Sequence, residues 1–592
     1  MSWQPLERTV QVIAEVALDR RGTWDRLDAA VGDGDFGTSL ARGFSVVRTE
    51  WEQLDRATPE AFLKAVAHLL GREIGGSSGP LLSVAFSRAG EAAGSAERVD
   101  VPLASRMLQV AADGIAEYGR SGVGDKTLLD ALVPAAKALA DAAAQGAGDP
   151  GLAWTAVAEA AAEGAASTRS LLARRGRAVY SAERNLGAPD PGAVAVAVVA
   201  ARLAGEFGYE APDVADLEVP AVEVPAEEAG AAGGEGDGSE SREAAPAGAE
   251  QTRALYQPLP TKKFLNDPDQ SAIESLVGLA KASPDLVVWE TEERIVRRSA
   301  PLPPGRVGLI SGGGSGHEPL HAGFVGFGML TAVAPGPVFA SPTTAQILAA
   351  TRAAHAGGGV LHIVKNYTGD VLNFRLAAEA AGAEGIEVAS VLVDDDVAVD
   401  GSAYTIGRRG TGATVFVHKL AGALADFGAP LEEVRQLAER VVRRSASFGI
   451  ALTSSSPPGA GPILQLGPDE IEVGVGIHGE RGRRRDRLRV AAELVAESEQ
   501  LLVSALQLQA GDRVLAMVNG FGGTPLMELY LLFNDLHDRL SSQGITVARN
   551  LVGNYVTSLD MAGASFTLLA LDPQLESLWD APVHTPALRW GR

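Results

Sequence analysis

Cysteine is absent from the 592-residue chain, which excludes disulfide bonds, catalytic thiolates and zinc sites built on cysteine. No run of about 18 or more apolar residues is free of charges, so a membrane-spanning helix is not expected. The first residues, MSWQPLERTVQVIAEV, also lack the apolar core of a signal peptide. We therefore expect a cytoplasmic protein without a membrane partner.

Positive charge is also scarce. The chain has 51 Lys and Arg against 74 Asp and Glu, a net charge of −23. This balance argues against nucleic acid or an anionic membrane as the main partner. An anionic substrate would have to be bound by local devices, such as glycine-rich loops, helix N-termini or metal ions. A chain of this length is expected to form two or more domains.

Residues 1–208 are rich in Ala and Leu and repeat apolar side chains at helical spacing, whereas strand-like alternation is scarce. Val10, Ile13, Ala14 and Ala17 form one such stripe. Further helices are expected near residues 77–92, 101–118, 127–145, 151–170 and 192–207. This part of the chain therefore predicts an all-helical domain.

Residues 209–252 differ in composition from both flanks. Between 211 and 250 there are eleven acidic residues against one basic residue, Arg242, among mostly Ala, Gly and Pro. Such a segment buries too little apolar surface to fold. We expect a disordered linker that lets the two flanking domains meet within a chain or across a dimer.

Residues 253–592 alternate short β-branched runs with helical stretches, a pattern typical of an α/β domain. The expected strands are residues 307–310, 359–364, 388–393, 413–417, 513–518 and 566–571.

The loop at residues 27–37, LDAAVGDGDFG, brings three carboxylates together in the amino half. Oxygen-only ligands such as Asp28, Asp33 and Asp35 favour a hard cation, Mg²⁺ or Ca²⁺. An EF-hand is excluded because no Glu stands twelfth from Asp28 or from Asp33. The alternatives are a site for Mg²⁺ with nucleotide phosphates, or a polar turn without metal.

Four glycine-containing connections punctuate the helical half. They are GGSSGP at 75–80, GVGDKT at 122–127, RRGR at 174–177 and DPG at 190–192. Backbone N–H groups at such helix starts can bind anions. Helices that run up and down bring alternate loops to one end, so a phosphate site at one rim is feasible. Taken singly, each is more often an ordinary helix–helix connection.

Polar motifs follow several expected strands, where sites in α/β proteins usually lie. They are SGGGSGHEP at 311–319, KNYTGD at 365–370, DDD at 394–396 and GVGIHGE at 474–480. His317 and His478 stand in glycine-dense loops, and Asp370 has a similar setting. A His–Asp pair beside a second His suits acid–base work on a hydroxyl or carbonyl, and a His can also attack a carbonyl carbon.

Three features leave alternatives open. His321, four residues after His317, could share a metal with it, although Pro319 intervenes and no third ligand is evident. The aspartates at 394–396 could form a second metal site or a turn that caps the following segment. The glycines at 312–316 lack the P-loop ending and the Rossmann spacing, and could instead admit a small polar substrate close to the backbone.

Together these motifs resemble the dihydroxyacetone kinase family over nearly the whole chain apart from the linker. The carboxyl half resembles its DhaK subunit, through KKFLNDP at 262–268, LISGGGSGHEPLHAGFVGFGML at 309–330, KNYTGDVLNF at 365–374 and GVGIHGE at 474–480. The amino half resembles its DhaL subunit, through the loop at 27–37, GDKTLLDALVPA at 124–135 and RAVYSAERNLGAPDPGA at 177–193. The resemblance implies a DhaL-like eight-helix barrel at residues 1–208 and a DhaK-like two-part α/β domain at 253–592.

The resemblance also implies roles for individual residues. Asp28, Asp33 and Asp35 would hold two Mg²⁺ ions that bridge the phosphates of ATP. The residues implied to bind the nucleotide are Gly76, Ser77, Ser78, Gly124, Thr127, Leu128, Arg177, Asp190, Pro191 and Gly192. His478 would form a hemiaminal with the substrate carbonyl, while His317 and Asp370 bind and activate the attacking hydroxyl. The residues implied to bind the substrate are Gly314, His317, Lys365, Asp370 and His478.

The implied function is ATP-dependent phosphorylation of the terminal hydroxyl of a short ketose, dihydroxyacetone or a ketotetrose such as D-erythrulose. The family further implies a homodimer whose active sites could form across subunits. The alternatives are a phosphotransferase fed by a phosphocarrier protein and a non-catalytic ketose sensor; some fused relatives also cleave flavin adenine dinucleotide. Fused relatives commonly place the DhaK half first. In this chain the DhaL-like half comes first. Together with Phe36, Phe327, Pro337 and Ala340, this reversed order departs from the family pattern and leaves the identity of the ketose substrate undetermined.

Overall fold

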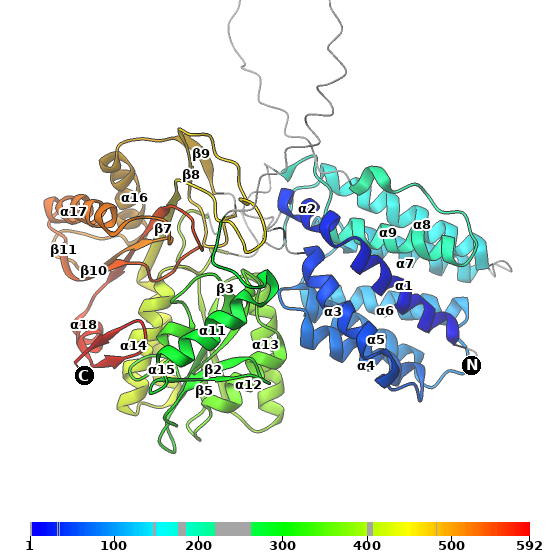
Figure 1. Ribbon diagram of the computed structural model, residues 1–592, viewed down its shortest axis with the longest axis horizontal. Coiled ribbons are helices and arrows are strands. Elements are labelled where there is room, and N and C mark those ends of the chain that lie inside the picture. Colours follow the sequence, from blue (N-terminus) through cyan, green and yellow to red (C-terminus); the bar gives the residue numbers. More distant parts are fainter. Residues whose placement is uncertain are drawn as a thin grey trace, which may run out of the picture.

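The computed structural model describes residues 3–31, 34, 36–145, 150–175, 185–218, 262–399, 407–480 and 482–591. Figure 1 shows two parts side by side, which we call the helical half (up to residue 218) and the α/β half (from residue 262). Among the described residues, no helix is long and apolar enough to cross a membrane.

The helical half is a closed ring of helices. They are α1 (Gln4–Asp19), α2 (Arg21–Val31), α3 (Phe36–Thr49), α4 (Pro59–Glu73), α5 (Ser78–Ala93), α6 (Val101–Gly119), α7 (Leu129–Ala144), α8 (Pro150–Ser167) and α9 (Pro191–Glu206). Each helix from α3 to α9 packs on the next, and α1 contacts both α3 and α9. Helices α1 and α2 both contact α3 and α9 and together fill one position of the ring. The described helices therefore form an eight-membered barrel, as the resemblance predicted.

Local sequence explains where several of these helices begin. Thr58, Asp100 and Asp190 each accept a hydrogen bond from the N–H three residues further on, and each is followed by Pro within two positions. A side-chain cap satisfies an N–H group that the helix leaves unpaired, and Pro is preorganised for the first turn. The apolar stripes of the helices then fill the centre of the ring, for example Phe62, Val66 and Leu70 of α4, all fully buried.

The first sheet of the α/β half has six strands in the order β1-β2-β4-β3-β5-β6. They are β1 (Val287–Glu290), β2 (Ile295–Arg298), β3 (Gly308–Ser315), β4 (Ala332–Val338), β5 (Val360–Lys365) and β6 (Val388–Val393). Strands β4, β3, β5 and β6 run parallel, and β3 and β5 are buried along their whole length. Their continuous apolar or glycine composition fits a sheet covered on both faces.

The second sheet is mostly antiparallel, in the order β11-β10-β12-β7-β8-β9. Its strands are β7 (Ser445–Ala451), β8 (Glu470–Val473), β9 (Arg484–Arg487), β10 (Arg513–Gly520), β11 (Thr546–Gly553) and β12 (Gly563–Ala570), and β13 (Val583–His584) pairs with β14 (Arg589–Trp590) apart from it. The helices of this half are α11 (Ser271–Ala282), α12 (Thr344–Ala354), α13 (Thr368–Ala383), α14 (Ala413–Phe427), α15 (Leu431–Arg443), α16 (Ala491–Leu506), α17 (Leu526–Ser542) and α18 (Pro573–Asp580).

One expected strand is wrong. Residues 413–417 form the start of α14 and not a strand. The chain is buried continuously from 411 to 423, so this part of the helix has no exposed polar face and the sequence shows no clear helical period. A short β-branched run in such a setting cannot be assigned by periodicity.

The segment expected to be a linker begins with residues that pack on the helical half. Leu217, in the short 3-10 helix Ala215–Glu218, is buried, and Glu218 pairs with Arg20 at 3.2 Å. The rest of the predicted linker, residues 219–252, lies outside the described residues.

Candidate active site

The loops singled out in the helical half meet at one end of the ring. The side-chain amide of Asn185 donates to the carbonyl oxygen of Val31 at 3.2 Å. Lys126 Nζ donates to the carbonyl oxygens of Asn185 and Leu171, at 2.9 and 3.2 Å. These bonds tie together the connections that follow α2, α6 and α8, as expected for helices that run up and down.

Asp130, in the first turn of α7, shapes the predicted nucleotide loop. Its carboxylate accepts from the N–H of Gly124 at 2.5 Å and from the N–H of Thr127 at 2.7 Å. Leu128 follows this loop, and a Cβ placed on Gly192 would lie 3.0 Å from the Cβ of Leu128. The predicted residues of two separate loops are therefore adjacent. Asp130 was not predicted, although an Asp just inside a helix after a glycine loop is a readable signal.

Acidic side chains converge at this rim. The Asp28 carboxylate accepts from the N–H groups of Gly34 and Phe36, at 2.9 and 3.3 Å. Asp190 caps α9, which begins at Pro191, by accepting from the N–H of Ala193 at 2.7 Å. Burial first, and then the nearby carboxylates of Asp130 and Asp28, raise the pKa of Asp190 to about 7.

The predicted metal site lies among these acidic side chains, since Asp28 is one of its three predicted ligands. Oxygen donors of this kind fit a hard cation such as Mg²⁺, whose charge would offset their mutual repulsion. Asp33 and Asp35, and the predicted nucleotide ligand Arg177, lie outside the described residues. Within the part of the chain that is described, no three acidic or histidine side chains are close enough together to hold one ion.

The predicted phosphate turn at residues 75–79 lies against the α/β half. Gly76 has a left-handed backbone, with φ of 66°, and its N–H donates to the carbonyl oxygen of Ser341 at 3.1 Å. Ser77 then precedes α5, and Ser78 is its first residue. The N–H groups at the start of this helix are therefore held beside the other half.

In the α/β half, β3 carries the glycine motif because neighbouring groups leave no room for side chains. A Cβ on Gly313 would lie 2.1 Å from Lys365 Nζ, and one on Gly314 would lie 2.6 Å from the backbone of Phe339. Gly313 also has φ of 152°. Glycine in a strand often marks such close approach.

His317 and His478 come together from different strands. His317 follows β3, His478 follows β8, and their ring centroids are 4.7 Å apart with an interplanar angle of 79°. Both side chains are buried, at 0% and 3% exposure. His317 Nδ1 lies 2.8 Å from the carbonyl oxygen of Thr557. Because a carbonyl only accepts, Nδ1 carries the proton, and Nε2 is the basic nitrogen of the neutral ring.

Two aromatic side chains frame this histidine pair. Phe339 stacks on His317 at 5.2 Å and meets His478 edge-on at 5.6 Å. Tyr367 meets His478 edge-on at 4.5 Å. Tyr367 stands inside a motif quoted above, but its role was not predicted. Nothing in the sequence marks Phe339, whose left-handed φ of 58° only the structure reveals.

Asp370 lies in the first turn of α13 beside a buried lysine at the end of β5. Lys365 Nζ is 3.5 Å from the Asp370 carboxylate and donates to the carbonyl oxygen of Gly312 at 3.0 Å. It also lies 2.8 Å from His321 Nε2, which must accept because an ammonium group only donates. Burial and the Lys365 charge hold the pKa of His321 well below its usual range. His321 therefore pairs with the lysine as a neutral ring.

The aspartates at 394–396 serve the turn that follows β6. Asp395 accepts from the N–H groups of Thr411 and Ala413, at 2.7 and 2.9 Å, and so caps the start of α14. Asp396 accepts from Arg409 Nε at 2.8 Å. Two hypotheses were open for this motif, and these contacts are those of the capping turn.

Arg409 connects that turn to the His478 loop. Its guanidinium also reaches Glu480 at 3.3 Å, and Glu480 in turn accepts from the N–H of His478 at 2.8 Å. All four side chains of this chain of contacts, from Asp396 to His478, are at least 95% buried. A buried hydrogen-bonded network of this kind fixes the geometry of the loop that it holds.

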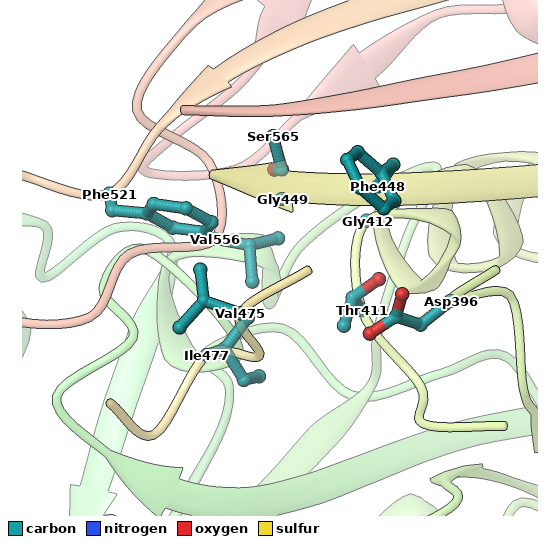
Figure 2. A pocket seen from close by; sticks show the side chains of 10 residues that line it. All are labelled: Asp396, Thr411, Gly412, Phe448, Gly449, Val475, Ile477, Phe521, Val556 and Ser565. Carbon is teal, nitrogen blue, oxygen red and sulfur yellow. The ribbon is translucent and has the colours of Figure 1, made fainter. Parts of the chain in front are cut away.

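A small cavity lies beside the segments that contain Val475, Ile477 and Val556 (Figure 2). Its wall is lined by Asp396, Thr411, Gly412, Phe448, Gly449, Val475, Ile477, Phe521, Val556 and Ser565. Ile477 and Val556 immediately precede His478 and Thr557, so the cavity lies on the apolar side of these loops. His317, Asp370 and His478 are not among its lining residues.

Known domain families match both halves of the chain. The model of the Dak1 domain matches residues 277–587, and that of the DAK2 domain matches residues 30–205. The helical match thus precedes the α/β match along the chain.

Individual proteins are similar to the α/β half. The chain is 48% identical over 328 residues to the dihydroxyacetone-binding subunit DhaK of PTS-dependent dihydroxyacetone kinase 1 from Listeria innocua, covering 55% of this chain and 99% of that protein. It is 43% identical over 334 residues to L-erythrulose 1-kinase of Mycolicibacterium smegmatis, covering 55% of this chain and 58% of that protein. The crystal structure of the dihydroxyacetone kinase from C. freundii in complex with AMP-PNP and Mg²⁺ matches with a TM-score of 0.50 and 35% identity, covering 55% of this chain and 61% of that one.

Proposed function

Because the chain belongs to the dihydroxyacetone kinase family, with the Dak1 domain matching more than half of its length, we propose that it is an ATP-dependent ketose kinase. It transfers the γ-phosphoryl group of ATP to the terminal hydroxyl of a short ketose. The observation that carries this proposal is the contact between the two predicted half-sites: the glycine turn of the helical half lies directly against the first turn of α13, which holds Asp370.

The ketose is held through its carbonyl carbon by His478. A ring nitrogen of His478 adds to the carbonyl carbon, the ring loses a proton and the carbonyl oxygen gains one, which gives a hemiaminal. Glu480 fixes the backbone of His478 by accepting its N–H, and Tyr367 packs edge-on against the imidazole. A covalent tie selects a ketose against glycerol, which has no carbonyl, and offsets the weak binding of so small a ligand.

His317 and Asp370 prepare the hydroxyl that attacks phosphorus. The hydrogen bond from His317 Nδ1 to Thr557 leaves Nε2 as the nitrogen able to take a proton. Asp370 accepts from the substrate hydroxyl, and the Lys365 ammonium lies 3.5 Å from that carboxylate and orients it. Gly314 would contact the substrate through its backbone, because the space on its Cβ side is filled by the backbone of Phe339.

The helical half binds the nucleotide. The N–H groups and hydroxyls of Gly76, Ser77 and Ser78 receive phosphate oxygens, and the loops of Gly124–Leu128 and Asp190–Gly192 close around the rest. Asp28, Asp33 and Asp35 would hold two Mg²⁺ ions. When bound, these ions neutralise the charge that develops on the phosphates during transfer. The carboxylates around Asp190 fit such a cation. A cytoplasmic location is part of this proposal, because ATP is available there.

Dihydroxyacetone and the ketotetrose erythrulose are the proposed substrates. The similar proteins include a dihydroxyacetone kinase and an L-erythrulose 1-kinase, and both ketoses present the same hydroxyketone end. Initial rates with dihydroxyacetone, glyceraldehyde, D-erythrulose and L-erythrulose at fixed Mg-ATP identify the substrate. We expect steady ADP formation with at least one ketose and none with glycerol.

Two other functions are outcomes of the same assay. One relative is PTS-dependent. If turnover required a phosphocarrier protein, that protein and not ATP would be the phosphoryl donor. Ketose binding without any turnover would indicate a sensor. The presence of both half-sites in one chain supports ATP as the donor.

The protein is also proposed to form a homodimer. Leu526, Met527, Tyr530 and Leu531 gather on α17 and are 49–78% exposed. Apolar side chains clustered on a surface are typical of an interaction site. Light scattering should give twice the chain mass, and Met527→Asp with Tyr530→Asp should give a single chain.

A further inference from the structure

Asn373 joins the two halves of the molecule. This side chain, on α13, is fully buried. Its amide nitrogen donates to the carbonyl oxygen of Gly76 at 2.7 Å and to that of Gly369 at 2.9 Å. Its amide oxygen accepts from the Thr344 hydroxyl at 3.0 Å. Both polar atoms of Asn373 are thus engaged, and one bond reaches the predicted phosphate turn.

Glycine is required on both sides of this contact. A Cβ on Gly369 would lie 2.8 Å and 2.9 Å from the backbone carbon and Cα of Gly76. A Cβ on Gly75 would lie 2.1 Å from the carbonyl oxygen of Ser341. The two halves therefore meet backbone against backbone, at a distance that any side chain would prevent.

Two further contacts fix the orientation of the halves. Arg375 donates to the carbonyl oxygen of Tyr118 at 3.2 Å and lies over the Tyr118 ring at 5.5 Å. Arg294 pairs with Glu73 at 3.5 Å. These contacts come from α13 and the β1–β2 turn on one side and from α4 and α6 on the other. They define an extended interface rather than a single point.

We propose that Asn373 is a positioning residue that sets the phosphate turn against Asp370 of the same chain, so that one chain carries a complete active site. Asp370 directly follows Gly369 and stands three residues before Asn373, while Ser77 directly follows Gly76. The buried amide of Asn373 therefore fixes the position of Asp370, which activates the hydroxyl, relative to the turn that binds phosphate. The kinetic part of this inference rests on the proposed function.

The first test separates positioning from binding. Asn373→Asp keeps the size of the side chain, but it removes both N–H donors and places a carboxylate against two carbonyl oxygens. We expect kcat to fall by about 100-fold, since a misplacement of about 1 Å costs that much. Binding of dihydroxyacetone, measured by calorimetry, should remain within about twofold.

Glu379→Gln, an exposed change on the same helix, is the matched control and should leave kcat unchanged. An unchanged kcat in Asn373→Asp would overturn the positioning role. A parallel loss of kcat and of ketose binding would also overturn it, because it would show that α13 itself had been damaged.

The second test does not depend on activity. Because the chain has no cysteine, Glu73→Cys with Arg294→Cys introduces its only two thiols, on the two sides of the interface. A short bismaleimide should link them within one chain, giving a product of single-chain mass whose linked peptides are identified after proteolysis.

Covalent dimers would show that the halves pair between chains, and the absence of any link would show that they do not dock in this way. Either result overturns the same-chain site. If the wild-type chain phosphorylated no ketose, the proposed function would be contradicted. The cross-linking result would still show whether the two halves dock within one chain.

Discussion

The imidazole rings of His317 and His478 meet edge to face, 4.7 Å apart, although one follows a strand of the first sheet and the other a strand of the second. The pair exists only when the two sheets are packed together. Phe339 and Tyr367 close around it from further segments. The chemistry proposed for the α/β half therefore depends on its tertiary structure as a whole.

Replacing His478 with Ala should remove the covalent tie to the ketose. We expect kcat/KM for the preferred ketose to fall by about 100-fold or more, because the bound carbonyl loses its fixed orientation. A coupled ADP assay measures this directly. His537→Ala, a change of a half-exposed histidine on α17, should have no effect. Unchanged phosphorylation in His478→Ala would show that the hemiaminal role is wrong.

Asp370→Asn should act on turnover rather than on binding. The amide cannot accept the hydroxyl proton, so kcat should fall by about 10²- to 10⁴-fold, the usual contribution of a general base. Ketose affinity should change little, since His478 still holds the carbonyl. Saturation kinetics in both substrates separate the two effects. A rise in KM at constant kcat would assign Asp370 to binding alone.

Asp28→Asn should weaken the use of magnesium. Losing one carboxylate ligand is expected to raise the Mg²⁺ concentration for half-maximal rate by about tenfold, within the range typical of altered surroundings at a metal site. Titration of Mg²⁺ at fixed ATP measures this, and chelation should abolish turnover. Asp19→Asn, an exposed change on α1, is the control. If both variants gave the same Mg²⁺ titration curve, Asp28 would not be a ligand of the metal.

Phe339→Ala should broaden the choice of ketose. Removing the ring that stacks on His317 opens space beside the histidine pair. The ratio of kcat/KM for erythrulose to that for dihydroxyacetone should rise by about 10-fold, because filling or emptying such a pocket changes discrimination by about 1–3 kcal/mol. An equal loss for both ketoses would mean that Phe339 only supports the fold.

Lys419 should make stability depend on pH. Burial lowers its pKa from 10.5 to about 8, and its ammonium donates to the carbonyl oxygen of Leu578 at 2.7 Å. Between pH 8 and 10.5 the unfolded chain keeps a proton that the folded chain has released, so this group's contribution to stability rises with pH. Below pH 8 it costs up to about 3 kcal/mol.

Lys419→Met removes that dependence. In urea denaturation, the advantage of Lys419→Met over wild type should be largest below pH 8 and shrink as the pH approaches 10.5. Lys281→Met, at an exposed position, should show no such trend. A constant difference across this range would contradict the lowered pKa.

The sequence predicts well those features that are written in contiguous stretches. The helices of the amino half repeat apolar residues at helical spacing, and His317, Asp370 and His478 stand in motifs that follow strands. Features created by contacts between distant segments were not predicted. Phe339 lines the site only because β3 lacks side chains at Gly314, and Asn373 gains its role only when Gly76 is brought to it. The run at 413–417 was mistaken for a strand because burial on all sides erases the helical period.

The contact of Gly76 with Gly369 and Asn373 uses main-chain atoms and one amide, so it does not depend on how the two halves are connected. The helical half could precede or follow the α/β half along a polypeptide, or be encoded by a separate gene, and present the same surface. Rearranging the coding segments would therefore preserve the assembled centre. Evolution could therefore change the order of the halves as long as this interface, including the contacts of Arg375 with Tyr118 and of Arg294 with Glu73, was kept.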